Sequence, residues 1–244
     1  ITQELGATSP EAQKLRFHTQ TGGSTLTAQQ PMNNIIRVAI QTLAATMGGT
    51  QSLHTNGFDE ALSLPTEQAA MIALRTQQIV AEESGICDTV DPWAGSYFIE
   101  TLTHDMEQAA MALVEKIDAM GGAVSAIEQG FVQEQIAQAS YEYQKAIERH
   151  DKIIVGVNKY VSKDLVETPI MKIDAAIEKQ QVTRLAEFKA ARNHDEVAAC
   201  LARISSAAEG TENLMPLVID AVEKHCTLGE IAHCLRNVWG EYKG

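Results

Sequence analysis

Residues 14–56 constrain the fold more than any other part of the sequence, because a helix period lies there between two strand periods. In KLRFHTQT (residues 14–21), apolar and polar residues alternate, which is typical of a strand with one apolar face. Residues 33–47 are predicted to form a largely buried helix, and QSLHTN (residues 51–56) the next strand. Such a βαβ unit favours a parallel sheet or barrel. The apolar face of the helix carries Ile36, Ile40, Leu43 and Met47.

Polar side chains stand toward the ends of both predicted strands, where the chemistry of βα proteins collects. Gln20 lies near the end of the first strand, and His54 and Asn56 near the end of the second. One isolated polar residue would favour a satisfied polar layer inside a barrel, but two neighbouring strands favour a ligand site. Glu60 follows near the start of an expected short helical segment, just above the second strand. It is either part of the ligand site or an exposed acid that complements the helix dipole.

Charge and hydropathy limit the class of protein. The formal net charge of the 244 residues is −13, with 32 Asp and Glu against 19 Lys and Arg, so general nucleic-acid binding is not expected. No apolar stretch approaches the roughly 20 residues that a membrane span needs. Because the first residues lack a basic region followed by an apolar one, we expect no signal peptide. These features predict a soluble protein of the cytoplasm or of an organelle matrix.

The four cysteines show no CxxC pairing, which favours reduced structural thiols. His225-Cys226 and His233-Cys234 weakly resemble metal-ligand pairs, but zinc ligands usually come in tighter spacing. We therefore expect no metal site formed by this chain.

The remaining sequence is predicted to be mostly helical. Thr66 and Gly85 are the expected cap and stop of one helix, and Thr168-Pro169 is the best linker candidate. Ser125 to Glu128 fits a capping box, and Asn193 and Thr227 are further predicted caps. The predicted helices cover residues 67–83, 105–120, 133–149, 171–192, 195–208, 213–225 and 228–240, with a short turn at 125–129 and one late strand at 152–158.

Several long runs resemble the large subunit of adenosylcobalamin-dependent acyl-CoA mutases, the methylmalonyl-CoA mutase family. They are HTQTGGSTLTAQQPMNNIIRVAIQ, GGTQSLHTNGFDEALSLPTE, ALRTQQIVAEESG, DTVDPWAGSYFIE and IIVGVNKY. The resemblance implies an α/β fold: the last strands of a (β/α)8 TIM barrel followed by a mostly α-helical extension. It assigns residues 1–100 to the C-terminal portion of the substrate-binding barrel and 101–168 to a helical extension with one strand. Residues 169–244 would be the helical segment before a cobalamin domain that this chain lacks.

The resemblance also implies a function: one part of an isomerase that rearranges the carbon skeleton of an acyl-CoA by a radical mechanism, with adenosylcobalamin as cofactor. On its own the chain is expected to be inactive. The implied partners are an acyl-CoA substrate, a cobalamin-binding small subunit or domain that supplies the cobalt ligand, and the missing N-terminal barrel half, together a hetero-oligomer. Glu60 and Asn56 match catalytic positions, Glu60 as acceptor for the adenosyl ribose. The implied cofactor-binding residues are Gln20, Gly23, Gln51, Asn56, Glu60 and Ala61.

The acyl substrate is left open by one departure from the family pattern. Many methylmalonyl-CoA mutases have Trp where this chain has Ser24, and Ser is more similar to the stand-alone large subunits. A mutase for isobutyryl-CoA or hydroxyisobutyryl-CoA is therefore an alternative. A second alternative is a non-catalytic helical scaffold derived from such a subunit, which would have no reason to keep polar residues together at two strand ends.

Overall fold

The computed structural model describes residues 2–162 and 168–242 of the chain. It divides into two compact units, residues 1–171 and residues 172–244, and each is described by itself. The boundary lies close to the linker expected at Thr168-Pro169. The protein is of the α/β class, mostly helical, with a small parallel sheet.

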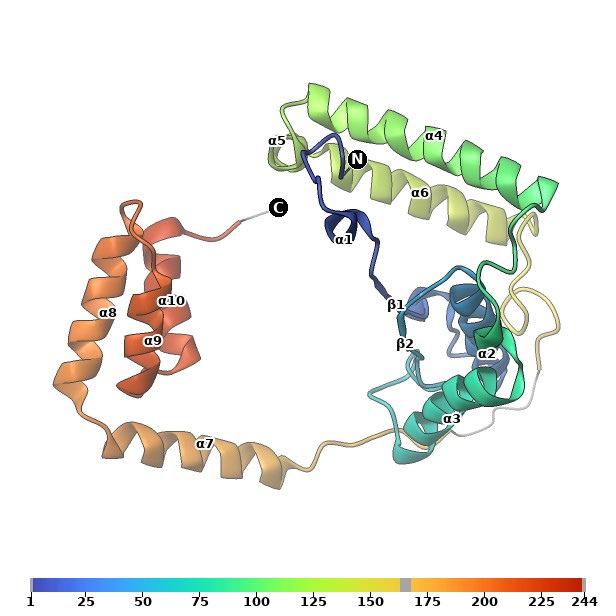
Figure 1. Ribbon diagram of the computed structural model, residues 1–244. Helices are drawn as coiled ribbons and strands as arrows, with labels where there is room; N and C mark the ends of the chain where they lie inside the picture. The colour runs from blue at the N-terminus through green and yellow to red at the C-terminus, as the bar shows by residue number, and fades with distance from the viewer. Residues whose placement is uncertain (1, 163–167, 243–244) are drawn as a thin grey trace. The chain divides into compact units, whose positions relative to one another are not determined.

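The sheet confirms the predicted βαβ unit, with strands shorter than the sequence pattern indicates. β1 (His18–Gln20) and β2 (Ser52–His54) are parallel, with Gln20 opposite His54, and α2 (Asn33–Met47) connects them (Figure 1). The ladder continues past both ends, because the amide of Thr21 donates to His54 and that of Gln51 donates to Phe17. Before the sheet lies the short α1 (Pro10–Gln13), and after β1 a 3-10 turn, η1 (Gly23–Thr25).

α2 has the predicted bounds but not the predicted buried face. Ile36 and Ile40 are 62% and 63% exposed, so the expectation of a largely buried helix was wrong. The buried positions follow a different i, i+4, i+8 stripe, and this helix packs against α3 (Glu67–Glu83) (Figure 1). The buried residues of α2 are Asn34, Val38 and Thr42.

The limits of α3 follow the sequence signals. Thr66 is its cap, and the side chain of Thr66 accepts a hydrogen bond from the amide of Ala69. Gly85 follows with φ of +70° and leads into η2 (Ile86–Asp88). Because a positive φ is easy for glycine, this residue ends the helix.

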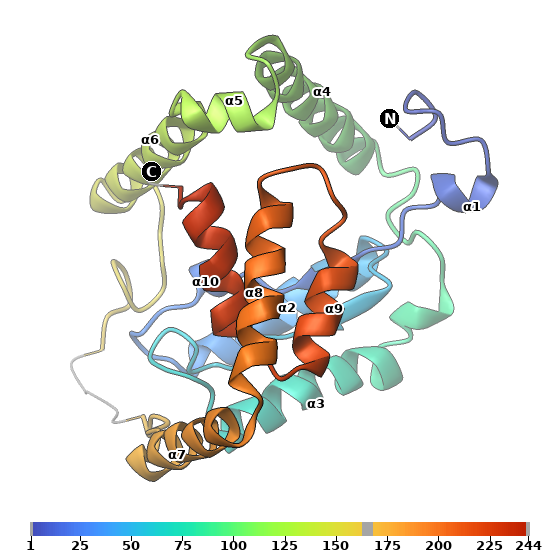
Figure 2. The same ribbon diagram turned by 90° about the vertical axis from the view of Figure 1, so that its left-hand side faces the viewer.

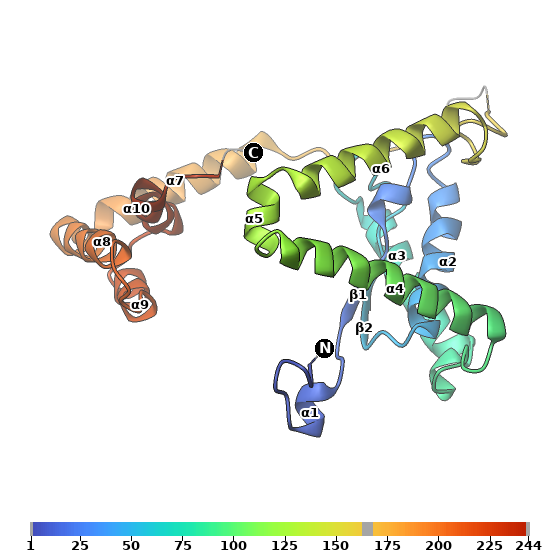
Figure 3. The same cartoon turned by 90° about the horizontal axis from the view of Figure 1, so that it is seen from above.

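Three helices follow: α4 (Tyr97–Ala119), α5 (Ala123–Glu128) and α6 (Phe131–Glu148), with α5 joining the other two (Figure 3). α4 begins earlier than predicted, at the end of the DPWAGSYFIE segment. The capping box expected at Ser125 is wrong, because Gly122 is the cap of α5 and Ser125 lies inside that helix.

Residues 152–158, predicted as a strand, form a loop with one isolated bridge between Val155 and Lys159. The side-chain amide of Asn158 closes this loop by accepting from the amide of Ile154 at 2.7 Å and donating to the carbonyl of Ile147 at 2.9 Å. Backbone groups that a strand would offer to a neighbour are thus used inside the loop.

The second unit is helical and has its own apolar core. α8 (His194–Ala208) packs against both α9 (Met215–Glu223) and α10 (Leu228–Trp239), and α7 (Ala175–Ala191) precedes them (Figure 2). Asn193 and Thr227 cap α8 and α10 as predicted. The core consists of Val197, Cys200, Ile204, Ala221, Cys226 and Ile231.

A partly buried ion pair joins the end of α7 to α10 in this unit. The guanidinium of Arg192 donates to both carboxylate oxygens of Glu230, and the two side chains are 6% and 22% exposed. The hydrogen bond from Arg192, assisted by those from Thr227, holds the pKa of Glu230 well below its ordinary value despite partial desolvation.

Candidate functional site

The face of the sheet that α3 does not cover is polar. Thr55 points the other way, since its hydroxyl donates to the carbonyl of Ala73 in α3 at 2.7 Å. Side chains alternate between the faces of a strand, so residues an even number of positions apart share a face. The polar face therefore carries His18, Gln20, Ser52, His54 and, beyond the strand, Asn56. His18 and Ser52 are bonded to each other at 2.7 Å.

Asn56 lies at the centre of the site and is only 2% exposed. Its amide oxygen accepts from Nε2 of Gln20 at 3.2 Å, and its backbone amide donates to the hydroxyl of Thr21 at 3.0 Å. Its Nδ2 is buried and has no partner among the described residues. Buried polar groups are usually hydrogen-bonded, so an unpaired amide donor at the end of a strand indicates a place for a ligand or water.

Gly23 brings the backbone of the loop after β1 close to this amide. A Cβ at residue 23 would lie 2.7 Å from Oε1 of Glu60 and 2.9 Å from Nδ2 of Asn56. The donor of Asn56 and the carboxylate of Glu60 thus converge on one point, and only a residue without a side chain leaves that point free.

The loop after β1 is held from α2. Oε1 of Gln41 accepts from the amide of Gly22, and Nε2 of Gln41 donates to the hydroxyl of Thr25, both at 2.6 Å. The hydroxyl of Thr25 in turn donates to the carbonyl of Gly22. The position of Gly23 is therefore fixed by a helix side chain that lies outside the site.

Glu60 and Ala61 lie in a turn, and the short helical segment expected there does not form. The amide of Glu60 donates to the carbonyl of Gly57 at 3.2 Å, while the side chain of Glu60 is exposed. Glu60 is thus an exposed acid beside Asn56, and it does not stand at a helix N-terminus. Ala61 is exposed next to it.

The sequence reasoning missed Asp59, which is completely buried beside these residues. Its Oδ2 accepts from the amide and the hydroxyl of Thr66, and its Oδ1 has no partner among the described residues. Asn34 was missed as well: its amide donates to the carbonyl of Phe58 at 2.8 Å and so supports the same turn. No local sequence pattern predicts these roles, because Asp59 bonds a residue seven positions away and Asn34 bonds one 24 positions away.

Gln51 is not part of this cluster. It precedes β2, at the end of the sheet opposite Asn56, and its Oε1 accepts from the amide of Phe17 at 2.7 Å. His54 shares the polar face of the sheet and is exposed. The structure thus brings Gln20, Gly23, Asn56 and Glu60 together, with Ala61 beside Glu60.

The described residues contain no group of three or more His, Cys, Asp or Glu side chains arranged to hold a metal ion. The thiols of Cys226 and Cys234 lie within hydrogen-bonding distance of backbone carbonyls in the second unit. Within residues 2–162 and 168–242, no helix is long and apolar enough to cross a membrane.

The geometry gives a candidate polar site at the carboxyl ends of two parallel strands, with one amide donor and one carboxylate acceptor over a glycine. A sequence model of the family described as Methylmalonyl-CoA mutase matches residues 1–241. The chain therefore belongs to the methylmalonyl-CoA mutase family.

Three relatives show how this chain compares with longer proteins. It is 42% identical to the "2-hydroxyisobutanoyl-CoA mutase large subunit" of Aquincola tertiaricarbonis, over 100% of this chain and 44% of that protein. It is 45% identical to the methylmalonyl-CoA mutase of Escherichia coli (strain K12), over 98% of this chain and 34% of the relative. It is 44% identical to the mitochondrial methylmalonyl-CoA mutase of Homo sapiens, over 94% of this chain and 31% of that protein. The chain spans less than half the length of these relatives.

Proposed function

We propose that this chain forms one wall of the active site in the large subunit of an adenosylcobalamin-dependent acyl-CoA mutase. The reaction class is a carbon-skeleton isomerisation of a coenzyme A thioester. The observation that carries the proposal is the buried, unpaired Nδ2 of Asn56 beside the Glu60 carboxylate, with Gly23 leaving the space between them free. A scaffold would gain nothing from an unpaired buried donor, since such a group destabilises the fold.

The residues of the cluster fit the adenosyl cofactor of the family. When bound, adenosylcobalamin supplies the radical chemistry, while the protein supplies binding, orientation and exclusion of water. The Glu60 carboxylate would accept hydrogen bonds from hydroxyl groups of the cofactor, and Asn56 would offer a donor. Gly23 and Ala61 allow a large planar group to approach, and Gln20 fixes the amide plane of Asn56. Gln51 lies at the other end of the sheet with its side chain bonded to Phe17 and Gly49, and its cofactor-binding role stays a prediction.

The proposed partners are the missing barrel half and a cobalamin-binding subunit or domain, which together with this chain make a hetero-oligomer. Among the described residues β1 pairs only with β2, and two-stranded sheets are marginally stable alone. Parallel sheets are normally extended and covered by helices on their outer faces. The unpaired edge of β1 is thus a place where a further strand would add.

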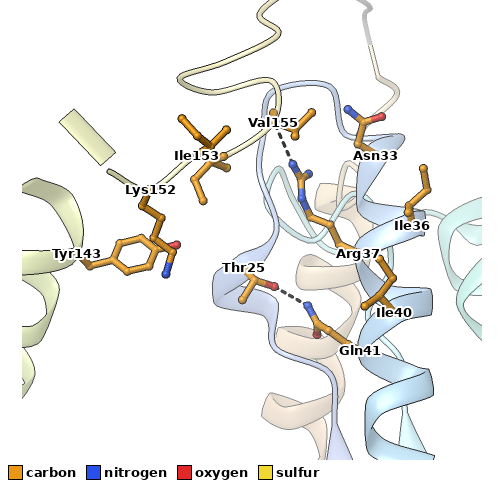
Figure 4. Close-up of a pocket in the computed structure, with 11 residues that line it drawn as sticks. Thr25, Asn33, Ile36, Arg37, Ile40, Gln41, Tyr143, Lys152, Ile153 and Val155 are labelled. Carbon is orange, nitrogen blue, oxygen red and sulfur yellow. Dashed lines mark hydrogen bonds between the residues drawn. The ribbon is translucent and has the colours of Figure 1, made fainter. Parts of the chain in front are cut away.

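A groove beside α2 supports the same partner (Figure 4). It has a volume of about 630 Å³ and separates α2 from the loop after α6. Ile36 and Ile40 face it from α2 and Ile153 from the loop, while Arg37 spans the two by donating to the carbonyl of Val155 at 2.8 Å (Figure 4). α3 already covers another face of α2. We therefore infer that the last helix of the missing barrel half fills this groove.

The partner is tested by mixing the chain with a separately produced missing half. Ile36→Asp places a charge in the proposed interface and is expected to weaken association at least tenfold, a loss of about 1.4 kcal/mol. Ile219→Asp, on an exposed apolar position of α9, is the matched control. Equal weakening by both variants, or by neither, would contradict docking at this groove.

The activity is tested with the complete large subunit and its cobalamin-binding partner. We expect isomerisation of an acyl-CoA in the presence of adenosylcobalamin, and no turnover by this chain alone. Glu60→Ala is expected to slow turnover by a factor of about 100 through loss of cofactor positioning. Glu67→Ala, another exposed acid at the start of α3, is the control and should behave as the wild type. A folded, assembled complex without activity on any acyl-CoA would overturn the proposal.

The acyl group is decided by a substrate panel of methylmalonyl-CoA, isobutyryl-CoA and 2-hydroxyisobutyryl-CoA. Ser24 is exposed in η1, beside Gly23, where the family pattern often has Trp. Ser at this position resembles the stand-alone large subunits of the family, which include those that act on isobutyryl or hydroxyisobutyryl groups. We therefore propose one of the latter two substrates, and exclusive activity on methylmalonyl-CoA would show that Ser24 does not set the preference. The cytoplasmic location stays a prediction.

A further inference from the structure

The carboxylate of Asp59 is buried completely, although it lies between two residues of the candidate site. Its Oδ2 accepts from the backbone amide of Thr66 at 2.9 Å and from the hydroxyl of Thr66 at 2.8 Å. Its Oδ1 packs against the turn so closely that a Cβ at Gly57 would lie 3.0 Å away. Burying a carboxyl group is costly unless its oxygens are hydrogen-bonded, and here Oδ2 is the oxygen with partners among the described residues.

The second unit offers an internal comparison. At the start of α10, Thr227 donates its amide and hydroxyl to Oε2 of Glu230, both at 2.9 Å, and accepts from the amide of Glu230. This is a capping box, in which cap and carboxylate belong to the same helix. Thr66 makes the same bonds at the start of α3, but the third residue of that helix is Ala69. The carboxylate comes instead from Asp59, outside the helix.

Because Asp59 takes the place of a carboxylate within the helix, it links the candidate site to α3. The backbone carbonyl of Asp59 also accepts from the amides of Leu62 and Ser63, at 2.8 Å and 3.1 Å. The amide of Asn34 holds the carbonyl of Phe58 from α2. The segment that carries Asn56 and Glu60 is therefore fastened to two helices. Thr55 bonds Ala73 of α3 just before Asn56, and Asp59 bonds Thr66 at the start of α3 just before Glu60.

We propose that Asp59 is a positioning residue, whose carboxylate caps α3 through Thr66 and thereby fixes Glu60 and Asn56 toward the adenosyl cofactor. This inference rests on the proposed function. Asp59 acts through its neighbours and does not itself touch the cofactor. The negative charge also lies at the N-terminus of α3, where the helix dipole favours it.

The first test is amide hydrogen exchange in this chain without cofactor. Asp59→Ala is expected to speed exchange of the Thr66 amide and of residues 57–63 about tenfold or more, because the bond that protects the Thr66 amide is lost. Asp59→Asn keeps an acceptor at the same place and should give an intermediate rate. Thr227→Val is the matched control: it should speed exchange at the start of α10 and leave residues 57–66 unchanged. Unaltered exchange in the turn of Asp59→Ala would overturn the inference.

The second test uses the assembled enzyme and the visible absorbance of adenosylcobalamin. Asp59→Ala is expected to slow the substrate-triggered absorbance change roughly tenfold to a hundredfold per bound cofactor, with partial rescue in Asp59→Asn. A merely structural role would reduce the amount of assembled complex but not the rate per bound cofactor. No absorbance change in the wild-type complex would defeat the proposed function, and with it the role of Asp59 toward the cofactor. A wild-type response together with an unaltered rate in Asp59→Ala would overturn this inference alone.

Discussion

The two units of the chain differ in the polar side chains that they bury, because the buried residues of the second unit are apolar whereas the first unit buries polar residues beside apolar ones such as Val38 and Phe58. In the second unit, apolar residues of α8, α9 and α10 surround one core, and Ile204 is fully buried. In the first unit, Asn34, Thr42, Asn56 and Asp59 are buried, while Ile36 and Ile40 of α2 are largely exposed.

The difference bears on how each unit is stabilised. A helical group with an apolar centre gains its stability from its own burial. A sheet segment that buries polar side chains and exposes apolar ones gains less from its own contacts, which agrees with the proposed ligand site and the proposed interface. The predictions below test this contrast.

The largest expected effect is in the core of the second unit. Ile204→Ala removes buried atoms and leaves a cavity, so we expect a loss of about 3 kcal/mol in the free energy of unfolding. Trp239, whose indole donates to the carbonyl of Ala208, reports this unit by fluorescence in a Trp93→Phe background. A loss below about 1 kcal/mol would mean that this core does not stabilise the unit.

Gly23→Ala tests the polar interior of the first unit. The new Cβ displaces the Glu60 carboxylate and the Asn56 amide, so we expect a roughly tenfold to hundredfold slower absorbance change of adenosylcobalamin in the assembled enzyme. Gly229→Ala is the control, because a Cβ there meets nothing within 4 Å. Equal rates for both variants would show that the space over residue 23 is not used.

Acid sensitivity is expected in the second unit. The bond from Arg192 lowers the pKa of Glu230 below the ordinary value of about 4.3. A lowered folded-state pKa adds stability above the ordinary pKa, and that stability is lost as the pH falls toward the lower folded-state value. Glu230→Gln should cost about 1 kcal/mol at neutral pH and should flatten the decrease in unfolding free energy between about pH 5 and pH 3. An unchanged slope in denaturant titrations would contradict this.

The smallest effect is expected on the exposed face of α2. Ile36→Gln in the isolated chain should change the free energy of unfolding by less than about 0.5 kcal/mol, since the side chain is already in water. Urea titration measures this directly. A loss similar to that of Ile204→Ala would remove the contrast between the two units.

Features set by neighbours in sequence could be predicted well. The bounds of α2 and α3 and the caps Thr66, Asn193 and Thr227 follow from hydrophobic period and capping residues alone. The parallel pairing of β1 and β2 followed from the single helix between them.

Features set by contacts between residues distant in sequence could not be predicted. The apolar stripe of α2 predicts burial, but which stripe is buried depends on what packs against the helix. KIIVGVN has the composition of a strand, yet Asn158 closes it into a loop through Ile147 and Ile154.

The candidate site divides in the same way. Gln20 and Asn56 could be paired from the sequence because both lie toward the ends of two parallel strands, and their side chains are indeed bonded. No sequence pattern indicated Asp59, because its hydrogen bonds are to Thr66, the cap of the next helix, seven residues away. Gln51 matches the family pattern, but its hydrogen bonds place it at the other end of the sheet.

The loop after β1 joins two neighbouring positions with very different freedom to change during evolution. Gly23 is confined by Glu60 and Asn56, whereas Ser24 is exposed in a loop that Gln41 of α2 holds through Gly22 and Thr25. Selection can therefore exchange the side chain at position 24 without disturbing the residues beside it. A family built this way can diversify what it accepts while inheriting the rest of its machinery intact.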